Sequence, residues 1–405
     1  MSATMKAVVF DGPGKVSIQD RPIPQRESET HPIPSPVPLT CHTKMRRHYN
    51  IRIARFKHRD DFYRDAFVSL YYGGLENDHD VIVKVQATAL CGSNPSELHV
   101  FRGHQPSATG FIMGHEFVGV VTEKGAAVKT VEIGDKIVSP FTTSCQTCFY
   151  CQHEMSSRCN ESLLFGCPKL DGGQAEFVRV PNADGTVVQA PAHVDDKALV
   201  LMADIFPTGY FGARNAFRLL APNVQPADAV VVVVGCGPVG LCAIVAALEH
   251  KPKHLFAVDS VPSRLALAKQ LGAEPLNFVE DKERMVQRVQ EVTEGRGADA
   301  VVEVVGLSPA LRTAFDLIRP FGVISSIGVH NAEIPWDGND AYNKNVRVQM
   351  GRCPVRSIFS DALAVLAKNQ DKFSFMFDKI IPLTDAVEGY DLFNNMKVQK
   401  VVFTV

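Results

Sequence analysis

Two patterns of apolar and polar positions divide the chain. In the first half, apolar and polar residues alternate over short runs at 5–20, 81–90, 117–125 and 132–140. Alternation with a period of two is typical of half-buried strands. The first run contains Gly-Pro-Gly at 12–14, which predicts a turn between two strands of a hairpin. Short strands separated by glycine turns predict a small β-barrel-like domain.

From about residue 229 the pattern changes, because buried strands now alternate with helices. Apolar runs at 229–235, 254–259, 298–306 and 322–328 read as strands, with helical patterns at 238–250, from about 263, and at 308–318. This succession predicts a parallel sheet wrapped by helices, and therefore an α/β fold. The tail, 350–405, adds a helical stretch at 360–368 and a strand-like end at 400–405.

Residues 26–76 fit neither pattern. They start with the proline-rich run 31–39 and continue into the basic tract 45–64, without a clean helical or strand period. We interpret the segment as an insertion into an otherwise regular domain, forming an exposed and poorly ordered loop. The alternative is a basic patch that binds acids or directs localisation.

Composition narrows the class of protein. The 405 residues are 45% hydrophobic and 21% charged, with a formal net charge of -2, and they suffice for two or three domains. Nothing here favours a nucleic-acid or membrane partner, and the N-terminus lacks the apolar core of a secretory signal. Ten cysteines, several of them clustered, point to metal binding rather than disulfides. We therefore expect a cytoplasmic protein.

A glycine-rich turn predicts a dinucleotide site. It lies between a strand and a helix, and the next strand ends at Asp259. Gly235 permits the tight turn, Gly237 lets the backbone approach a pyrophosphate, and Gly240 lets the helix pack on the sheet. Asp259 would bind the ribose hydroxyls, which favours NAD, whereas Arg264 nearby leaves NADP open. The full turn comprises Gly235, Cys236, Gly237, Pro238, Val239 and Gly240.

Four cysteines stand close together at Cys145, Cys148, Cys151 and Cys159. Four thiolates can surround one tetrahedral zinc and leave no position for substrate, so this spacing predicts a structural site. The remaining cysteines read as small buried hydrophobic residues, apart from Cys41 in the insertion, which has no evident role.

A second set of donors suits a catalytic zinc. Cys91 closes a strand, His115 and Glu116 are adjacent, and Asp204 lies farther along the chain. One thiolate, one imidazole and one carboxylate would leave the fourth zinc position open for an alcohol or water.

In this order, the motifs resemble the zinc-dependent medium-chain alcohol dehydrogenase family. They are MKAVVF, CGS…LH, GHEFVG, the four-cysteine lobe, GGQAEFVRVP, PTGY and GCGPVG, and they cover nearly the whole chain outside 26–76. GGQAEFVRVP and DIFPTGY look most like the subgroup that includes glutathione-independent formaldehyde dehydrogenases. The resemblance implies a GroES-like catalytic domain, a doubly wound Rossmann domain, and a dimer or tetramer acting on a small alcohol or aldehyde.

The resemblance also implies a domain division and a set of ligands. The catalytic domain would span 1–205 with its zinc lobe at 140–165, the Rossmann domain 206–345, and the completing C-terminal segment 346–405. Cys91 and His115 match the first two catalytic zinc ligands. Asp204 matches the third, and Glu116 is the fallback.

Further positions match residues that handle protons and cofactor. Ser93 matches the hydroxyl that takes the alcohol proton, and His99 the outer end of that relay. Thr208, Asp259 and Arg264 match cofactor-contacting positions. Lys400 matches a basic phosphate contact more loosely.

Two departures from the family pattern leave alternatives open. Asn94-Pro95-Ser96 separates Ser93 from Glu97, the acid expected to support the zinc histidine, and 26–76 replaces a short connection. One hypothesis is that the longer insertion, or both insertions, are translated intervening sequence. The alternative functions are a catalytically impaired NAD-binding protein and a polyol dehydrogenase that uses Glu116 at zinc.

Overall fold

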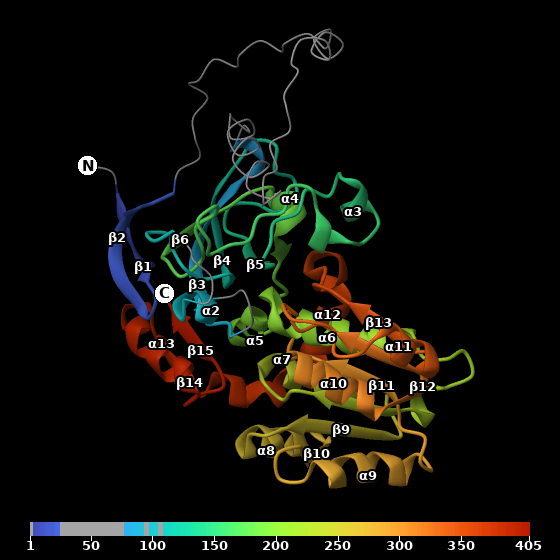
Figure 1. Cartoon of the computed structure of the whole chain (residues 1–405). Helices are drawn as coiled ribbons and strands as arrows, with labels where there is room; N and C mark the ends of the chain where they lie inside the picture. Colours follow the sequence, from blue (N-terminus) through green and yellow to red (C-terminus); the bar gives the residue numbers. More distant parts are fainter. Residues whose placement is uncertain (1–2, 25–76, 93–96, 104–107) are drawn as a thin grey trace, which may run out of the picture.

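The structure, a computed structural model, describes residues 3–24, 77–92, 97–103 and 108–405 (Figure 1). The predicted insertion at 26–76, Ser93 and the segment 94–96 lie outside the described residues. Figure 1 shows two bodies of secondary structure, one around β3–β6 and the other around β8–β13. Among the described helices, none is long and apolar enough to cross a membrane.

The first body contains a seven-stranded sheet in the order β14-β15-β3-β4-β5-β7, with β6 also pairing with β3. Its strands are β3 (Val81–Ala89), β4 (Glu116–Lys124), β5 (Lys136–Ser139), β6 (Phe177–Val180), β7 (Val188–Gln189), β14 (Lys379–Pro382) and β15 (Val401–Thr404). Short helices join them: α2 (Glu97–Phe101), α3 (Phe149–Gln152), α4 (Ala183–Thr186) and α5 (Asp196–Val200). The β-rich first domain is therefore as predicted.

The predicted N-terminal hairpin is also confirmed. β1 (Thr4–Gly12) pairs antiparallel with β2 (Lys15–Pro22) in a two-stranded sheet. Gly14 takes a φ of 71° in the turn, a conformation that glycine adopts without steric cost. The buried residues of β1, including Val8 and Phe10, share one hydrophobic cluster with Leu90 and Phe403 of the first body.

The second body is built on a six-stranded parallel sheet in the order β10-β9-β8-β11-β12-β13. The strands are β8 (Val230–Val234), β9 (His254–Asp259), β10 (Glu274–Asn277), β11 (Ala298–Glu303), β12 (Ile318–Ser326) and β13 (Arg347–Met350). The helices are α6 (Ile205–Arg218), α7 (Pro238–Leu248), α8 (Pro262–Leu271), α9 (Lys282–Val292), α10 (Ser308–Leu317) and α11 (Gly338–Lys344). This is the doubly wound arrangement that the alternation predicts.

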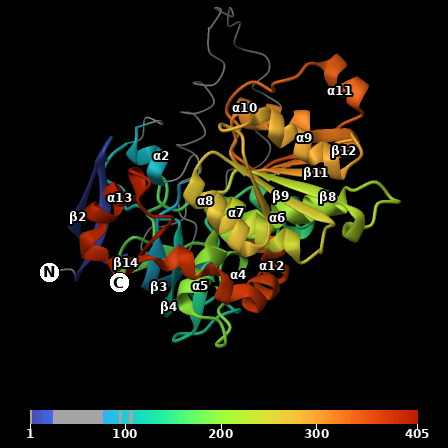
Figure 2. The ribbon, with the colours of Figure 1, turned by 90° about the horizontal axis from the view of Figure 1, so that it is seen from below.

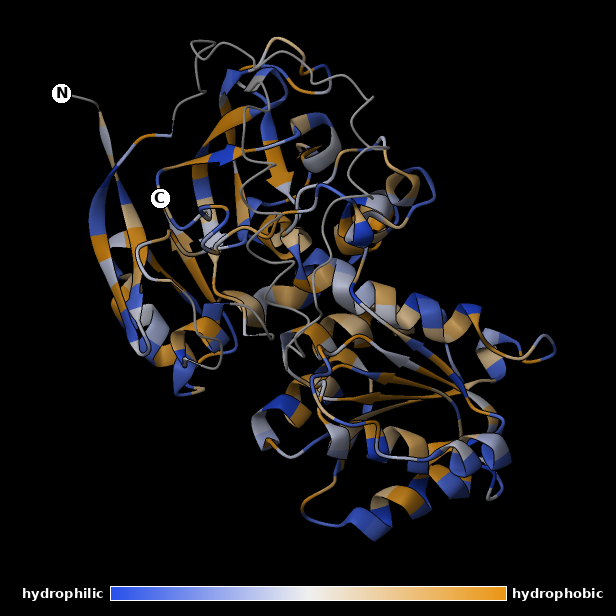
Figure 3. Cartoon of the chain, turned by 45° about the horizontal axis from the view of Figure 1, so that its top comes forward, coloured by the Kyte–Doolittle hydropathy of each residue, from blue (hydrophilic) through white to orange (hydrophobic). Residues whose placement is uncertain are grey.

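Both faces of the parallel sheet are covered, which explains its continuous apolar strands. Every residue of β8 is buried. Val231 and Val233 pack with residues of α6 and α7, whereas Val230 and Val232 pack with α9 and α10. Figure 2 shows α9 and α10 on one side of the sheet and α7 on the other, and Figure 3 shows the apolar strands between helices with polar outer faces.

The C-terminal segment contributes strands to the sheets of both bodies. β13 extends the parallel sheet past the predicted boundary at residue 345, because it pairs with β12. α12 (Val355–Asn369) then packs on α6, and α13 (Ala386–Asn394) precedes β15. β15 pairs antiparallel with β3, with Val402 opposite Ala89, so the end of the chain completes the first sheet.

Candidate active site

Four side chains predicted as catalytic-metal ligands lie together. The ligand atoms of Cys91, His115, Glu116 and Asp204 are all within 4.8 Å of one another, and all four residues are buried. The pairing of β3 with β4, with Ala89 opposite Glu116, brings Cys91 beside His115. Asp204 arrives from the N-terminus of α6, where it occupies the N-cap position.

The donors converge on one carboxylate oxygen. Asp204 Oδ2 lies 3.5 Å from Cys91 Sγ and 3.2 Å from His115 Nε2. Burial, and then the charge of Asp204, raise the pKa of the Cys91 thiol to about 11. A bound cation would offset both effects, because the thiolate is the form that ligates metal. The set of one sulfur, one nitrogen and one carboxylate fits zinc with an open fourth position.

Glu97 supports His115 from behind. Its Oε1 accepts a hydrogen bond from the His115 backbone N–H at 2.8 Å and lies 3.1 Å from His115 Nδ1. A proton on Nδ1 leaves Nε2 free to bind a metal. Glu97 opens α2, so the three extra residues that precede it do not remove this contact.

The second carboxylate of the cluster, Glu116, is paired. Its Oε2 lies 2.6 Å from Lys400 Nζ, and both side chains are almost fully buried. Lys400 also donates to the Leu90 carbonyl at 3.0 Å. Lys400 also lines the cavity that contains the glycine turn, so its predicted contact with a cofactor phosphate stays a prediction, and in this structure its ammonium binds Glu116 and the Leu90 carbonyl.

The remaining predicted catalytic residues are placed as follows. His99 lies on α2 and lines the cavity in front of the cluster, whereas Ser93 lies outside the described residues. Thr208 also lines this cavity, and its hydroxyl donates to Asp204 Oδ1 at 2.8 Å. Thr208 thereby fixes the orientation of Asp204, a contact that the sequence did not suggest.

The glycine turn has the local geometry that a dinucleotide needs. Gly235 has a φ of 99°, and a Cβ on Gly240 would overlap the Gly235 carbonyl oxygen. A Cβ on Gly237, by contrast, would meet nothing within 4 Å, so this position faces open space. Gly237 is the N-cap of α7, whose N-terminal N–H groups suit an anion.

Asp259 has a structural task in addition to the predicted one. Its carboxylate accepts hydrogen bonds from the backbone N–H groups of Cys236 (2.7 Å), Ser260 (2.7 Å) and Val261 (2.9 Å). These bonds tie the end of β9 to the glycine turn. Arg264 Nη1 is 4.0 Å from Asp259 Oδ2, so the predicted pair of cofactor residues lies together.

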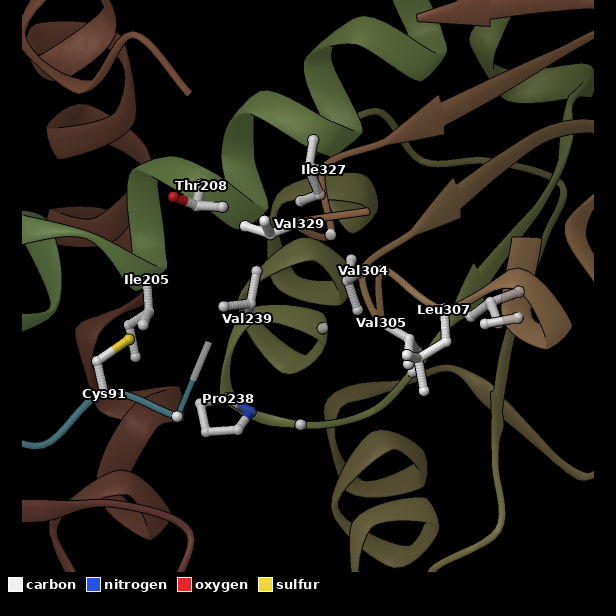
Figure 4. A pocket seen from close by; sticks show the side chains of 18 of the residues that line it. Cys91, Ile205, Thr208, Pro238, Val239, Val304, Val305, Leu307, Ile327 and Val329 are labelled. Carbon is white, nitrogen blue, oxygen red and sulfur yellow. The ribbon is translucent and has the colours of Figure 1, made fainter. Parts of the chain in front are cut away.

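One cavity joins the metal cluster to the glycine turn. Its volume is about 1570 Å³, and its lining includes Cys91, His115 and Asp204 as well as 237–240 and Asp259. Figure 4 shows Cys91 and Thr208 on one side and an apolar wall on the other. That wall consists of Val304, Val305, Leu307, Ile327 and Val329.

The four-cysteine lobe forms a second, closed cluster. The sulfur atoms of Cys145, Cys148, Cys151 and Cys159 lie within 4.8 Å of one another. Backbone N–H groups donate to these sulfurs, from Cys148 to Cys145 at 3.4 Å and from Cys145 to Cys159 at 3.3 Å. Hydrogen bonds from the backbone of Asn160 and Cys151 lower the pKa of Cys148 to about 6. Four thiols without a carboxylate or open position fit a structural zinc.

Three other cysteines match the reading as buried hydrophobic residues. Cys236, Cys242 and Cys353 are almost inaccessible to solvent, and burial raises their thiol pKa. Cys167 is partly exposed, and its thiol donates to the Leu164 carbonyl at 3.1 Å.

Two further residues line the cavity, Arg158 and Arg352, and sequence analysis did not identify them. Arg158 lies inside the cysteine lobe, and Arg352 follows β13. Neither belongs to a motif with a chemical meaning, and only the fold brings them to the same cavity.

Comparison with known proteins shows similarity along the chain. The model for the alcohol dehydrogenase GroES-like domain matches residues 77–192, and that for zinc-binding dehydrogenase matches residues 238–368. Zinc-type alcohol dehydrogenase B of Aspergillus flavus is 56% identical over 399 residues, covering 98% of this chain and 81% of that relative. Glutathione-independent formaldehyde dehydrogenase of Pseudomonas aeruginosa is 29% identical, covering 79% and 88% respectively. Among solved structures, alcohol dehydrogenase TADH from Thermus sp. ATN1 aligns with a TM-score of 0.78 at 29% identity, covering 99% and 100% of the two chains.

Proposed function

Because the chain belongs to the zinc-binding alcohol dehydrogenase family, a family of zinc-dependent oxidoreductases, we propose that it transfers a hydride between an alcohol, or an aldehyde hydrate, and NAD. The observation that carries this proposal is the single cavity that holds both the metal donors and the glycine turn. A reacting alcohol at the donors and a dinucleotide on the turn would share this space.

The proposed catalytic ligands are Cys91, His115 and Asp204. Asp204 is favoured over Glu116 because its Oδ2 faces both other donors, while the Glu116 carboxylate is paired with Lys400. The same pairing weighs against a polyol dehydrogenase that uses Glu116 at zinc. Cys145, Cys148, Cys151 and Cys159 would hold a second, structural zinc.

Zinc, when bound, would lower the pKa of the substrate hydroxyl, and NAD would accept the hydride. The chain's own residues prepare the site for this chemistry. Glu97 holds the His115 ring, and Thr208 holds the Asp204 carboxylate. Ser93 and His99 are proposed to carry the hydroxyl proton toward solvent, as the family resemblance implies, and His99 lines the cavity. The apolar wall excludes water from the space between alcohol and cofactor.

NAD is proposed over NADP because Asp259 stands at the end of β9 beside the turn. A carboxylate there binds ribose hydroxyls and repels a 2′-phosphate. Arg264, 4.0 Å away, keeps NADP as the alternative that the assay must compare. We also propose a homo-oligomer in the cytoplasm, where the nine described cysteines, none of which forms a disulfide, would stay reduced.

The test combines a zinc count with an alcohol panel. We expect two zinc ions per chain and reduction of NAD, with a lower kcat/KM for NADP. Asp204→Ala should lose one zinc and the activity, whereas Glu116→Gln, its matched control, should keep both ions. Two bound zinc ions without oxidation of any alcohol would reject the enzyme in favour of the catalytically impaired NAD-binding protein.

A further inference from the structure

Two arginines from distant parts of the fold face the same end of the cavity. Arg158 ends the 3-10 helix η3 (Ser156–Arg158) of the cysteine lobe, directly before Cys159. Arg352 follows β13 at the edge of the parallel sheet. Both side chains line the cavity that contains the metal cluster.

Phe141 places Arg352 at the metal end of the cavity. The Arg352 Cζ atom lies 5.9 Å from the centroid of the Phe141 ring. That ring is itself 6.0 Å, centroid to centroid, from the ring of the metal-site residue His115. The glycine turn and Asp259, which would bind the cofactor phosphates and ribose, belong to a different part of the lining. Arg352 is therefore positioned for the substrate rather than for the adenosine half of NAD.

The charge of the pair is not balanced by an ion pair. Among the described residues, no carboxylate forms a salt bridge with Arg158 or Arg352. Desolvation and then the positive charge of Arg158 lower the pKa of Arg352, opposed by Asp204, so the two guanidinium groups lie close enough to repel each other. Arg102, a third arginine of the lining, differs because it donates to the Asn394 side chain and carbonyl at 2.8 and 3.0 Å.

The lobe is fixed against the element that carries Arg352. The backbone N–H of Ser156 donates to the Ser357 hydroxyl at 3.2 Å, and the Ser357 N–H donates to the Ser156 hydroxyl at 3.3 Å. Ser357 lies in the first turn of α12, shortly after Arg352. The four-cysteine cluster on one side and this reciprocal contact on the other therefore hold together the two backbone segments that carry Arg158 and Arg352.

We propose that Arg158 and Arg352 bind a carboxylate of the substrate, so that the preferred substrates are hydroxy acids or the corresponding aldehyde acids. Guanidinium groups bind carboxylates through paired, charge-assisted hydrogen bonds. An anion between the two arginines would also relieve their mutual repulsion. The reacting carbon would sit at the metal donors, and the carboxylate at the opposite end of the substrate. This inference rests on the proposed dehydrogenase function for its reaction, but its binding step does not.

The experiment compares alcohols that differ only in the carboxylate. For the zinc-loaded, full-length enzyme with NAD, kcat/KM is measured for 6-hydroxyhexanoate against 1-hexanol, and for 8-hydroxyoctanoate against 1-octanol. We expect the hydroxy acid of at least one pair to be preferred by about tenfold or more. Arg158→Gln and Arg352→Gln should each remove most of this preference while changing kcat/KM for the neutral alcohol less than about twofold.

Two further variants test whether the preference depends on these two arginines rather than on the overall positive charge of the cavity or on a disturbed fold. Arg102→Gln removes one positive charge from the same lining and should keep the preference. Arg158→Lys should restore part of it, and a zinc count of two shows that the lobe is intact. An equal kcat/KM for acid and neutral alcohol in every pair would overturn the inference and leave the proposed function standing.

A binding measurement covers the case in which no alcohol is oxidised. Adipate is titrated calorimetrically into the protein with NAD present. Binding that is lost in Arg158→Gln and Arg352→Gln supports the inference even if the proposed function fails. The absence of binding together with the absence of turnover contradicts both.

Discussion

Glu97 Oε1 accepts a hydrogen bond from the His115 backbone N–H at 2.8 Å and lies 3.1 Å from His115 Nδ1. One carboxylate thus fixes both the backbone and the ring of the histidine in the metal cluster. Glu97 keeps this position although its spacing from Cys91 departs from the family pattern.

Glu97→Gln should lower the affinity of the catalytic site for zinc by about 10- to 100-fold. The amide cannot match the charge that holds the Nδ1 proton, so Nε2 becomes a weaker ligand. Competition with a chelator measures the affinity. The four-cysteine site is the internal control, since it does not contact Glu97 and should retain its ion. Unchanged competition at the catalytic site would show that Glu97 is dispensable.

Lys400→Met should lower the free energy of unfolding by about 3–5 kcal/mol, because it leaves the Glu116 carboxylate buried without its cation. Lys379→Met is the matched control. Its ion pair with Glu388 is 2.7 Å long but lies at the surface, so its loss should cost less than about 1 kcal/mol. Denaturant unfolding of the two variants measures the difference. An equal loss of unfolding free energy in both variants would mean that burial does not make the Lys400–Glu116 pair more important than a surface pair.

Gly237→Ala and Gly240→Ala should affect different properties, the first NAD binding and the second stability. The first places a methyl group in open space where the cofactor would approach, so stability should stay within about 1 kcal/mol while NAD binding weakens on the order of tenfold. The second forces a methyl group onto the Gly235 carbonyl and should destabilise the fold by about 1–3 kcal/mol. Unfolding curves and NAD titrations distinguish them. Unchanged NAD affinity in Gly237→Ala would show that the cofactor does not bind against Gly237.

Asp184 provides a pH-dependent contribution to stability. Burial alone would raise its pKa, but the backbone N–H of Lys129 and the N–H and hydroxyl of Thr130 outweigh it and lower the pKa. The stabilisation is therefore complete above the ordinary aspartate pKa of about 4 and declines as the pH falls through the lower native value. Asp184→Asn should lower Tm at neutral pH by an amount corresponding to less than about 1 kcal/mol, and the difference should shrink in acid. A constant difference at all pH values would contradict this account.

The elements that follow from local pattern were predictable. The five buried valines of β8, the glycine turn and α7 form one continuous segment, so their spacing alone indicated strand, turn and helix. The four cysteines lie within a short segment, and their spacing indicated one metal. Short edge elements were missed. β13, β14 and α13 are too brief, or too dependent on their neighbours, to show a period of their own.

The side-chain partnerships across the fold could not be predicted in the same way. Cys91 and Asp204 meet only because α6 begins beneath the β3–β4 pair, and the family resemblance rather than spacing suggested it. The ion pair of Lys400 with Glu116 could not be predicted, because it depends on how β15 docks. Arg158 and Arg352 carry no motif, so only the folded chain shows that they are neighbours.

The pairing of β15 with β3 has a consequence for synthesis on the ribosome. Leu90 and Lys400, which meet beside the metal cluster, are separated by 310 positions. A nascent chain that already contains all four residues of the metal cluster still lacks β15. It also lacks Lys400, the cation that pairs with Glu116. Until β15 emerges, the 87–89 end of β3 lacks its partner strand and Glu116 lacks the lysine that pairs with it. A chain truncated before residue 400 should therefore lack both contacts and aggregate more readily than the full chain.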